Sequence, residues 1–231
     1  MSLLETLQGT AVNGAAIVVG ALLGLFLGRL IPERLNEIAM QGIGLAVMLI
    51  GFQMAIKSEQ VLILIISLVL GGVTGELLKL EEIMLKIGRR LEKMAGGKNM
   101  QLARAFVYAA LIYAVGAMSV TGALESGLLG RHQILYAKAA LDGISSVVFA
   151  STMGIGVAFA ALPVMLYQGS IALLARWASI FLTDAVIVEF SAVGGLLIVA
   201  IGLNLLQLKT IKVGNLLPAL LFNALMVYWL V

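Results

Sequence analysis

Long apolar runs alternate with short polar segments along this chain, and the runs have the length of membrane spans. The apolar runs occupy residues 11–31, 38–56, 61–78, 105–124, 134–153, 155–182, 185–207 and 213–231. A helix needs about 20 predominantly apolar residues to cross the hydrocarbon core of a bilayer. The pattern therefore predicts an all-α, polytopic transmembrane bundle of about eight spans, folded as a single domain over residues 1–231.

The one substantial polar segment, residues 79–104, separates the third run from the fourth. Its sequence LEEIMLKIGRRLEKM places Ile83, Leu85, Ile87 and Leu91 between charged residues. Such a pattern is typical of an amphipathic helix lying at the membrane surface, and a solvated loop helix is the alternative.

The middle of the chain combines hydrophobicity with groups that lipid does not tolerate. Residues 115–130 and 138–170 hold three charged residues, several hydroxyl residues and many glycines. An unpaired polar group facing lipid has no water to bond, so these stretches should face the protein interior or an aqueous cavity. The fourth span meets glycine and hydroxyl residues in quick succession: Gly116, Ser119, Thr121 and Gly122. This cluster predicts a discontinuous helix, and a re-entrant pair of half-helices within 144–182 would change the span count.

These central stretches supply the candidate binding residues for a substrate or an ion. They are Ser119, Thr121, Glu125, Lys138, Asp142, Ser146, Ser151 and Thr152. Lys138 and Asp142 are spaced i, i+4 and can pair on one helix face. Ionisable residues inside a span are candidates for function. Alternatively, Lys138 extends to the outer interface as an anchor and Glu125 is an ordinary interfacial helix end. For Asn13 and Gln168, hydrogen bonding between helices is the preferred role.

The composition supports the prediction of a membrane protein and excludes several kinds of metal site and disulfide bonds. The chain is 61% hydrophobic and only 12% charged, with a mean hydropathy of +1.10, whereas soluble domains are about half apolar and a quarter charged. The net charge of +3 lies in short loops, so it indicates membrane orientation rather than a nucleic-acid partner. The chain has no cysteine and one histidine, which excludes disulfides, thiolate metal sites and multi-histidine sites.

Catalytic patterns are missing from the sequence. There is no nucleophile–base arrangement and no phosphate-binding loop in the required strand–loop–helix context. His132 is expected to be exposed in a loop, without an evident partner. We therefore expect neither an enzyme nor a cofactor, and the sequence leaves any metal unassigned.

The basic residues predict the orientation. With eight spans and residues 79–104 in the cytoplasm, only Lys57, Arg131 and Arg176 of the fifteen Lys and Arg residues lie outside. Lys138 lies within a span, which leaves 15 − 3 − 1 = 11 on the cytoplasmic side. This positive-inside bias predicts that both termini face outward.

Two spans carry small-residue faces that suit close helix packing. They are formed by Gly20, Gly24 and Gly28 in the first span and by Gly71 and Gly75 in the third. Such faces let two backbones approach closely. They predict a homo-oligomer, most simply a dimer, and packing within one subunit is the alternative.

A weak internal repeat relates the two ends of the chain. GIGLAVMLIGFQMAI (42–56) is similar to GGLLIVAIGLNLLQL (194–208), with Gln53 matching Asn204. Because the two units begin on spans of opposite parity, the repeat predicts a 3+3 inverted arrangement of spans one to three and six to eight, as in many transporters. The alternative is a chance alignment of glycine-rich apolar helices.

The segments GAMSVTGALESGL, KAALDGISSVVFASTMGIGVAFAALPVMLYQG and GTAVNGAAIVVGALLGLFLG resemble the bacterial YdfK/YqgA-like membrane protein family, a family classed as a domain of unknown function. The resemblance covers essentially the whole chain. It implies a multi-pass protein of the bacterial inner membrane with a role in transport, and it names no ligand.

The sequence as a whole favours a transporter of a small solute or ion. Its partners would be the lipid bilayer and that solute, with a proton or sodium ion as the coupling ion, because no nucleotide site is present. A passive ion channel is one alternative, and a structural or regulatory membrane protein is another.

Overall fold

The computed structural model describes residues 3–28, 32–94 and 101–231, and every regular element within these ranges is helical. The elements in chain order are α1 (Leu3–Gly28), α2 (Glu33–Ala55), α3 (Val61–Leu78), α4 (Leu80–Met94), α5 (Gln101–Ala114), α6 (Ala117–Leu129), α7 (Gln133–Met153), α8 (Gly156–Phe159), α9 (Ala161–Leu173), α10 (Ala175–Phe181), α11 (Asp184–Leu205), the 3₁₀ turn η1 (Val213–Leu216) and α12 (Pro218–Leu230). The predicted all-α fold is confirmed.

The helices match the predicted spans closely. Within the described residues, seven helical segments are long and apolar enough to cross a membrane, among them α8 and α9 taken together and η1 and α12 taken together. The pair α5 and α6 would be the eighth, and these two helices meet at an angle of 62°. The first helix begins at Leu3, eight residues before the predicted apolar run, so residues 3–10 are helical as well.

The chain divides into two compact units, and each is built from two separate stretches of sequence. Unit 1 contains residues 1–36 and 87–180, and unit 2 contains residues 37–86 and 181–231. The predicted polar segment forms α4, whose Ile83 and Ile87 are 46% and 45% exposed. Residues 95–100 of that segment lie outside the described residues.

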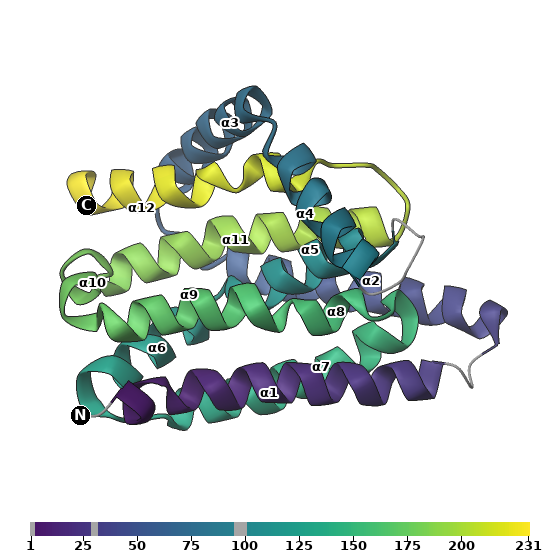
Figure 1. Ribbon diagram of the computed structural model, residues 1–231. Helices are drawn as coiled ribbons and strands as arrows, with labels where there is room; N and C mark the ends of the chain where they lie inside the picture. Colours follow the sequence, from purple (N-terminus) through teal and green to yellow (C-terminus); the bar gives the residue numbers. More distant parts are fainter. Residues whose placement is uncertain (1–2, 29–31, 95–100) are drawn as a thin grey trace. The chain divides into compact units, whose positions relative to one another are not determined.

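In unit 1, α1 and α7 lie side by side along their length (Figure 1). Glycines of α1 face the backbone of α7 in the pairs Gly20–Gly143, Gly24–Val147 and Gly28–Ser151, where an added Cβ would overlap a carbonyl oxygen. The constant difference of 123 in these residue numbers shows that the two helices run parallel. Small residues therefore join the two helices at backbone distance.

In unit 2, glycines also bring helix backbones together. Gly71 and Gly75 of α3 lie against Ala219 of α12 and Asn215 of η1, and here the residue numbers run in opposite directions. The same holds for α2 and α11, where Gly51 meets Gly195. Unit 2 therefore consists of helices that pack antiparallel through glycine contacts.

These contacts decide between the two roles considered for the glycine faces. Gly20, Gly24, Gly28, Gly71 and Gly75 all pack against helices of the same chain. The expectation that these faces form a dimer contact is therefore wrong, since the surfaces are already used. Dimerisation itself stays a prediction without an assigned contact.

The predicted break in the fourth span lies at Gly116. This residue has φ = 140°, a conformation that side-chain-bearing residues rarely adopt. Helix α5 ends at Ala114, and α6 begins at Ala117 in a new direction. The break leaves the last carbonyl groups of α5 and the first N–H groups of α6 without partners in a continuous helix.

Candidate functional site

A chain of hydrogen bonds in unit 1 connects the helix break to α1. The Ser119 hydroxyl, in the first turn of α6, donates to the carbonyl of Tyr113 at 2.9 Å. The Gln168 amide on α9 donates to Ser119 Oγ at 3.3 Å, and the Asn13 amide on α1 donates to Gln168 Oε1 at 3.2 Å. Because Asn13, Gln168 and Ser119 are each 0% exposed, this network is a buried polar core inside an apolar unit.

A buried ion pair on α7 lies in the same unit. The Lys138 ammonium is 3.0 Å from Asp142 Oδ1 and 2.9 Å from Oδ2, and only the first contact has hydrogen-bond geometry. The exposed fractions of these residues are 7% and 6%. One turn further along, the Ser146 hydroxyl donates to the Tyr113 phenol oxygen at 2.8 Å. Tyr113 therefore accepts a hydrogen bond from Ser119 through its carbonyl oxygen and one from Ser146 through its phenol oxygen.

Four of the predicted site residues thus lie around one buried region: Ser119, Lys138, Asp142 and Ser146. Three others bond to their own helices instead. Thr121 donates to Ala117, Ser151 to Val148 and Thr152 to Phe149, in each case to a backbone carbonyl. Glu125 lies half-buried in the second half of α6. The binding role of these last four residues stays a prediction that the network does not support.

The sequence did not predict binding roles for four residues of this region: Thr10, Asn13, Tyr113 and Gln168. Asn13 and Gln168 were expected to bond between helices, and they bond each other. Tyr113 and Thr10 were not singled out. Thr6, Thr10 and Asn13 are all buried on one face of α1, at the i, i+4, i+7 spacing of a helix stripe. This stripe of polar residues in an apolar run is the sequence pattern that could have indicated a buried polar region along α1.

Two buried oxygen atoms on α1 accept no hydrogen bond within the described residues. They are Thr10 Oγ1 and Asn13 Oδ1. The Asn13 side chain also lies close enough to the Asp142 carboxylate to interact with it. Buried polar atoms without a protein partner are uncommon, so these two atoms call for a partner such as a water molecule or a ligand.

His132 differs from its predicted state. It is half-buried and lies 2.8 Å from Ser126 Oγ through Nδ1, and its ring contacts Tyr136. The single Ser126 proton is donated to the carbonyl of Thr6 at 2.9 Å. His132 Nδ1 must therefore carry the proton in its bond with Ser126. This bond connects α6 and α7 to the first turns of α1, which is a structural role.

Two buried polar side chains of unit 2, Glu189 and Asn215, bond backbone groups at the ends of other helices. Glu189 is 2% exposed and accepts hydrogen bonds from the Ser58 hydroxyl at 2.6 Å and from the backbone N–H groups of Glu59 and Gln60 at 2.6 Å and 3.0 Å. It therefore caps the turn between α2 and α3.

A second group of polar residues in unit 2 connects α4 to η1. Glu81 accepts from the N–H of Gly214 and its own N–H donates to Asn215, while Glu76 pairs with Lys212 at 2.8 Å. The hydrogen bond from Lys212 to this carboxylate raises the pKa of Lys212 above its ordinary value. These contacts fasten a loop and suggest no ligand.

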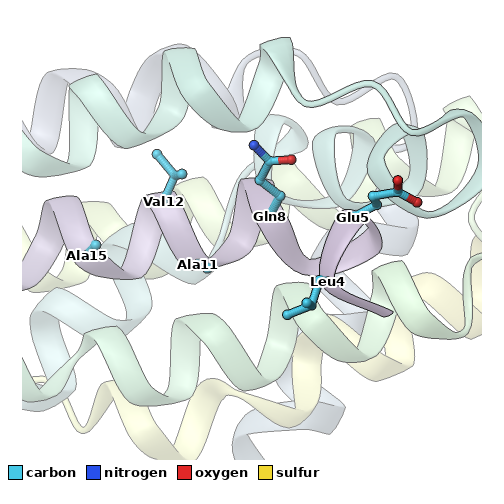
Figure 2. Close-up of a pocket in the computed structure, with 6 residues that line it drawn as sticks. All are labelled: Leu4, Glu5, Gln8, Ala11, Val12 and Ala15. Carbon is cyan, nitrogen blue, oxygen red and sulfur yellow. The ribbon is translucent and has the colours of Figure 1, made fainter. Parts of the chain in front are cut away.

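Two surface hollows lie away from the polar core. An open groove of about 500 Å³ runs along α1 past Glu5, Gln8, Val12 and Ala15, and Figure 2 shows these side chains on successive turns of that helix. A second, of about 290 Å³, lies beside Glu59, Asp184 and Glu189 in unit 2. The α1 groove is on the face opposite the buried Asn13, so it does not open onto the network.

Metal coordination by acidic or histidine clusters finds no support in the described ranges. Within residues 3–28, 32–94 and 101–231, no three or more His, Asp or Glu side chains are grouped so that they could hold a metal ion.

The comparisons with known proteins agree with the fold. The family model described as "Protein of unknown function (DUF554)" matches residues 8–228. The chain is 33% identical over 224 residues to the uncharacterized membrane protein YdfK of Bacillus subtilis, covering 95% of each chain. It is 30% identical over 218 residues to the uncharacterized protein YqgA of Escherichia coli, covering 92% of this chain and 93% of the relative. No solved structure matches. With its apolar helices and these relatives, the chain is a membrane protein that belongs to the DUF554 family.

Proposed function

We propose that this protein is an ion-coupled carrier of a small solute or ion in the bacterial inner membrane. The observation that carries the proposal is the buried Lys138–Asp142 pair beside a hydrogen-bond network that is incompletely satisfied. A charged pair within a membrane span is costly to desolvate. Such groups are kept where they contact substrates or ions.

The broken helix supports the same proposal. Carriers commonly bind substrates and ions between half-helices, where free N–H groups and free carbonyl groups face each other. The break at Gly116 provides both kinds of helix end, and Ser119 satisfies the carbonyl of Tyr113 there. A solute that competes for Ser119 would release that carbonyl, which gives binding a direct effect on the geometry of the break.

The contacts of unit 2 have the register expected of an inverted repeat. Gly44 and Gly51 become Gly195 and Gly202 when 151 is added to their numbers. A Cβ on Gly51 would lie 2.6 Å from the Gly195 carbonyl oxygen, and one on Gly195 would lie 2.5 Å from the Gly51 carbonyl oxygen. Gly44 and Gly202 approach each other at the other end of the same crossing. A two-fold axis that exchanges α2 with α11 would exchange these two contacts.

The same offset recurs within unit 1, where a Cβ on Gly14 would overlap Met165, its own equivalent, since 14 + 151 = 165. The matched amides behave differently, because Asn204 bonds both the N–H and the carbonyl of Ile211 whereas Gln53 is exposed. An inverted repeat of backbones with divergent side chains is the expectation for an alternating-access carrier.

The proposed orientation places α4 in the cytoplasm and both chain ends outside, from the eleven-to-three distribution of basic residues. Single cysteines at Glu82 and at Arg131, both exposed, test this in a chain that has no cysteine of its own. An impermeant thiol reagent should label the Arg131→Cys variant in intact cells and the Glu82→Cys variant only after lysis. Labelling of both from the same side contradicts the topology.

The functional test compares Asp142→Asn with Asp184→Asn. Both substitutions remove one carboxylate charge, but Asp184 is exposed in the first turn of α11. Purified protein would be screened by thermal shift against small solutes and inorganic ions, and each stabilising compound then applied as a concentration jump to proteoliposomes. We expect a compound that stabilises the parent protein and gives a saturable transport current. Both responses should be lost in Asp142→Asn and kept in Asp184→Asn.

Other outcomes would favour the alternatives. A current that rises linearly with the applied gradient would indicate a passive channel. If no compound stabilises the protein, no current flows, and Asp142→Asn melts as the parent does, the polar core has only a structural or regulatory role.

A further inference from the structure

Helix α4 starts immediately where the apolar helix α3 ends. Lys79 alone separates Leu78, the last residue of α3, from Leu80, the first residue of α4, and it adopts the left-handed conformation with φ = 53°. A left-handed residue ends a helix and turns the chain, and α4 leaves α3 in a new direction (Figure 1). Because α3 has the length and hydropathy of a membrane span, α4 begins at the level of the membrane surface.

One side of α4 packs against the η1 turn. The Glu81 carboxylate accepts a hydrogen bond from the N–H of Gly214 at 2.7 Å, and the Glu81 N–H donates to the Asn215 side chain at 2.7 Å. A Cβ on Gly214 would lie 2.9 Å from the sulfur atom of Met84. These contacts fix which side of α4 faces η1 and which side is left free.

The opposite side of α4 carries two isoleucines and two basic residues. Successive residues of an α-helix are rotated by about 100° around its axis. Measured from Glu81, the rotations are roughly 140° for Lys86, 180° for Arg90, 200° for Ile83 and 240° for Ile87. All four side chains are exposed, and the two isoleucines are exposed by 46% and 45%. An apolar strip and a basic strip therefore run side by side on the free face of this helix.

The two basic side chains of this face are not neutralised by the protein. Within the described residues, neither Lys86 nor Arg90 forms an ion pair. Residues 79–90 contain four basic and two acidic residues, and the carboxylate of one acidic residue, Glu81, is engaged by the N–H of Gly214. The free face of α4 is therefore positively charged and complements an anionic partner.

A phospholipid with an anionic headgroup matches both strips. Helices at a membrane interface place apolar side chains among the acyl chains and basic side chains at the level of the phosphates, and they bind more strongly to anionic lipids. The start of α4 at the end of a span brings lipid within reach of this face. A soluble protein partner would have to displace lipid headgroups from the same place.

We propose that the free face of α4 binds anionic phospholipids of the surrounding bilayer. The face consists of Ile83, Lys86, Ile87 and Arg90. This binding does not depend on the proposed carrier function. Because Glu81 joins α4 to the η1 turn, bound lipid also holds the loop that links α11 to α12. Anionic lipid therefore stabilises the folded protein, and salt weakens the effect by screening the charges.

The first test places an environment-sensitive fluorophore on single cysteines in a chain that has no cysteine of its own. Ile87→Cys reports on the apolar strip, and the exposed Glu82→Cys, roughly 140° away around the helix, is the matched control. The labelled proteins are reconstituted into nanodiscs of phosphatidylcholine, with or without added phosphatidylglycerol. We expect phosphatidylglycerol to shift the emission at position 87 to shorter wavelength, to leave position 82 unchanged, and to lose its effect at high salt.

The second test measures the melting temperature of the protein in uncharged detergent while short-chain phosphatidylglycerol is added. A ligand that binds only the folded protein raises its stability with ligand concentration. The double variant Lys86→Gln with Arg90→Gln removes both cations, so the lipid concentration at half-maximal response should rise about fivefold or more. The double variant Lys57→Gln with Arg176→Gln removes two exposed cations elsewhere and should match the parent. Glycerol phosphate, the headgroup without acyl chains, should have no effect.

Three results would overturn the proposal. Emission at position 87 that is the same in both kinds of nanodisc shows that the face does not recognise anionic lipid. Equal lipid responses in the parent and in the Lys86 and Arg90 double variant show that these cations do not bind it. A response to glycerol phosphate as strong as that to the lipid assigns the face to a free phosphate compound. If the double variant does not fold, the salt dependence of the emission at position 87 decides.

Discussion

The two units of this protein keep their polar side chains in different places. In unit 1, Asn13, Gln168 and Asp142 lie deep within helices, where the backbone is already fully hydrogen-bonded. In unit 2, Glu189 and Asn215 bond backbone N–H groups at the N-terminal ends of α3 and α4, which would otherwise have no partner. Polar groups that bond helix ends have a clear use in stability, whereas a buried ion pair and amides bonded to each other within a bundle do not.

Other buried polar residues of unit 2 lie within helices and do not bond helix ends. Asn223, in the middle of α12, is 0% exposed, and neither polar atom of its side chain has a hydrogen-bond partner among the described residues. Ser67, on the helix that packs against α12, bonds to its own backbone carbonyl and to Met226 instead. The contrast between the units therefore rests on the buried Lys138–Asp142 ion pair and on the buried chain of side-chain hydrogen bonds, both of which lie within the helices of unit 1.

The largest effect should come from the glycine contacts that both units use. Gly24→Leu would drive a side chain into the carbonyl of Val147 and the methyl group of Ala150. Backbone cannot move aside easily, so the free energy of unfolding should fall by about 3 kcal/mol or more, seen as a lower melting temperature or loss of folded protein. Gly42→Leu is the matched control, because no atom of the described residues lies within 4 Å of a Cβ there.

A dimer contact at this face would give another result. Gly24→Leu would then shift the protein toward monomer in light scattering while its melting temperature stayed near that of the parent. Such an outcome would contradict the packing of α1 against α7.

Glu189→Gln should have the next largest effect and should act on stability alone. The substitution places an NH₂ group among donors and removes the charge that holds the Ser58 hydroxyl and two N–H groups. A loss of roughly 1–3 kcal/mol is expected, measured by thermal unfolding, with the thermal-shift response to ligand unchanged. The neighbouring exposed Glu59→Gln serves as the control. A changed ligand response in Glu189→Gln would mean that the units do not divide structure from function in this way.

Much of the fold could be predicted from the sequence because membrane helices must be long and apolar. The apolar runs became helices, the glycine and hydroxyl cluster at Gly116 became a break, and the i, i+4 spacing of Lys138 and Asp142 became an ion pair. In each case the information is local, within one or two helical turns.

The remaining features depend on which helix lies opposite. Thr121, Ser151 and Thr152 bond to carbonyls three or four residues back, and no pattern distinguishes such hydroxyls from the one on Ser119 that crosses to another helix. The glycine faces indicate close packing but not the partner, which is α7 for Gly24. The division into two units joins distant stretches of sequence, so spacing along the chain does not reveal it.

The double variant Asn13→Leu with Gln168→Leu should change stability by about 1 kcal/mol or less. Each single change strands a buried partner, at roughly 1–3 kcal/mol, whereas replacing both removes the unmet groups together. We therefore expect the double variant to melt closer to the parent than either single variant does, and to lose the ligand response completely. Additive losses of melting temperature with an intact ligand response would make this network a stabilising one, like the helix-end contacts of unit 2.

The smallest effect should come from Lys212→Gln, which removes the exposed ion pair with Glu76. Both side chains are 60% exposed, and pairs of this kind contribute little to stability and less in salt. The melting temperature near neutral pH should match that of the exposed Lys209→Gln.

The carboxylate raises the pKa of Lys212. Any stabilisation is therefore present below the ordinary lysine pKa of about 10.4 and is lost as the pH rises through the higher folded value. A difference between the two variants that grows with alkaline pH would contradict this sign. A clear loss of stability at neutral pH in Lys212→Gln alone would mean that this loop is fastened by charge as well as by the backbone bonds of Glu81 and Asn215.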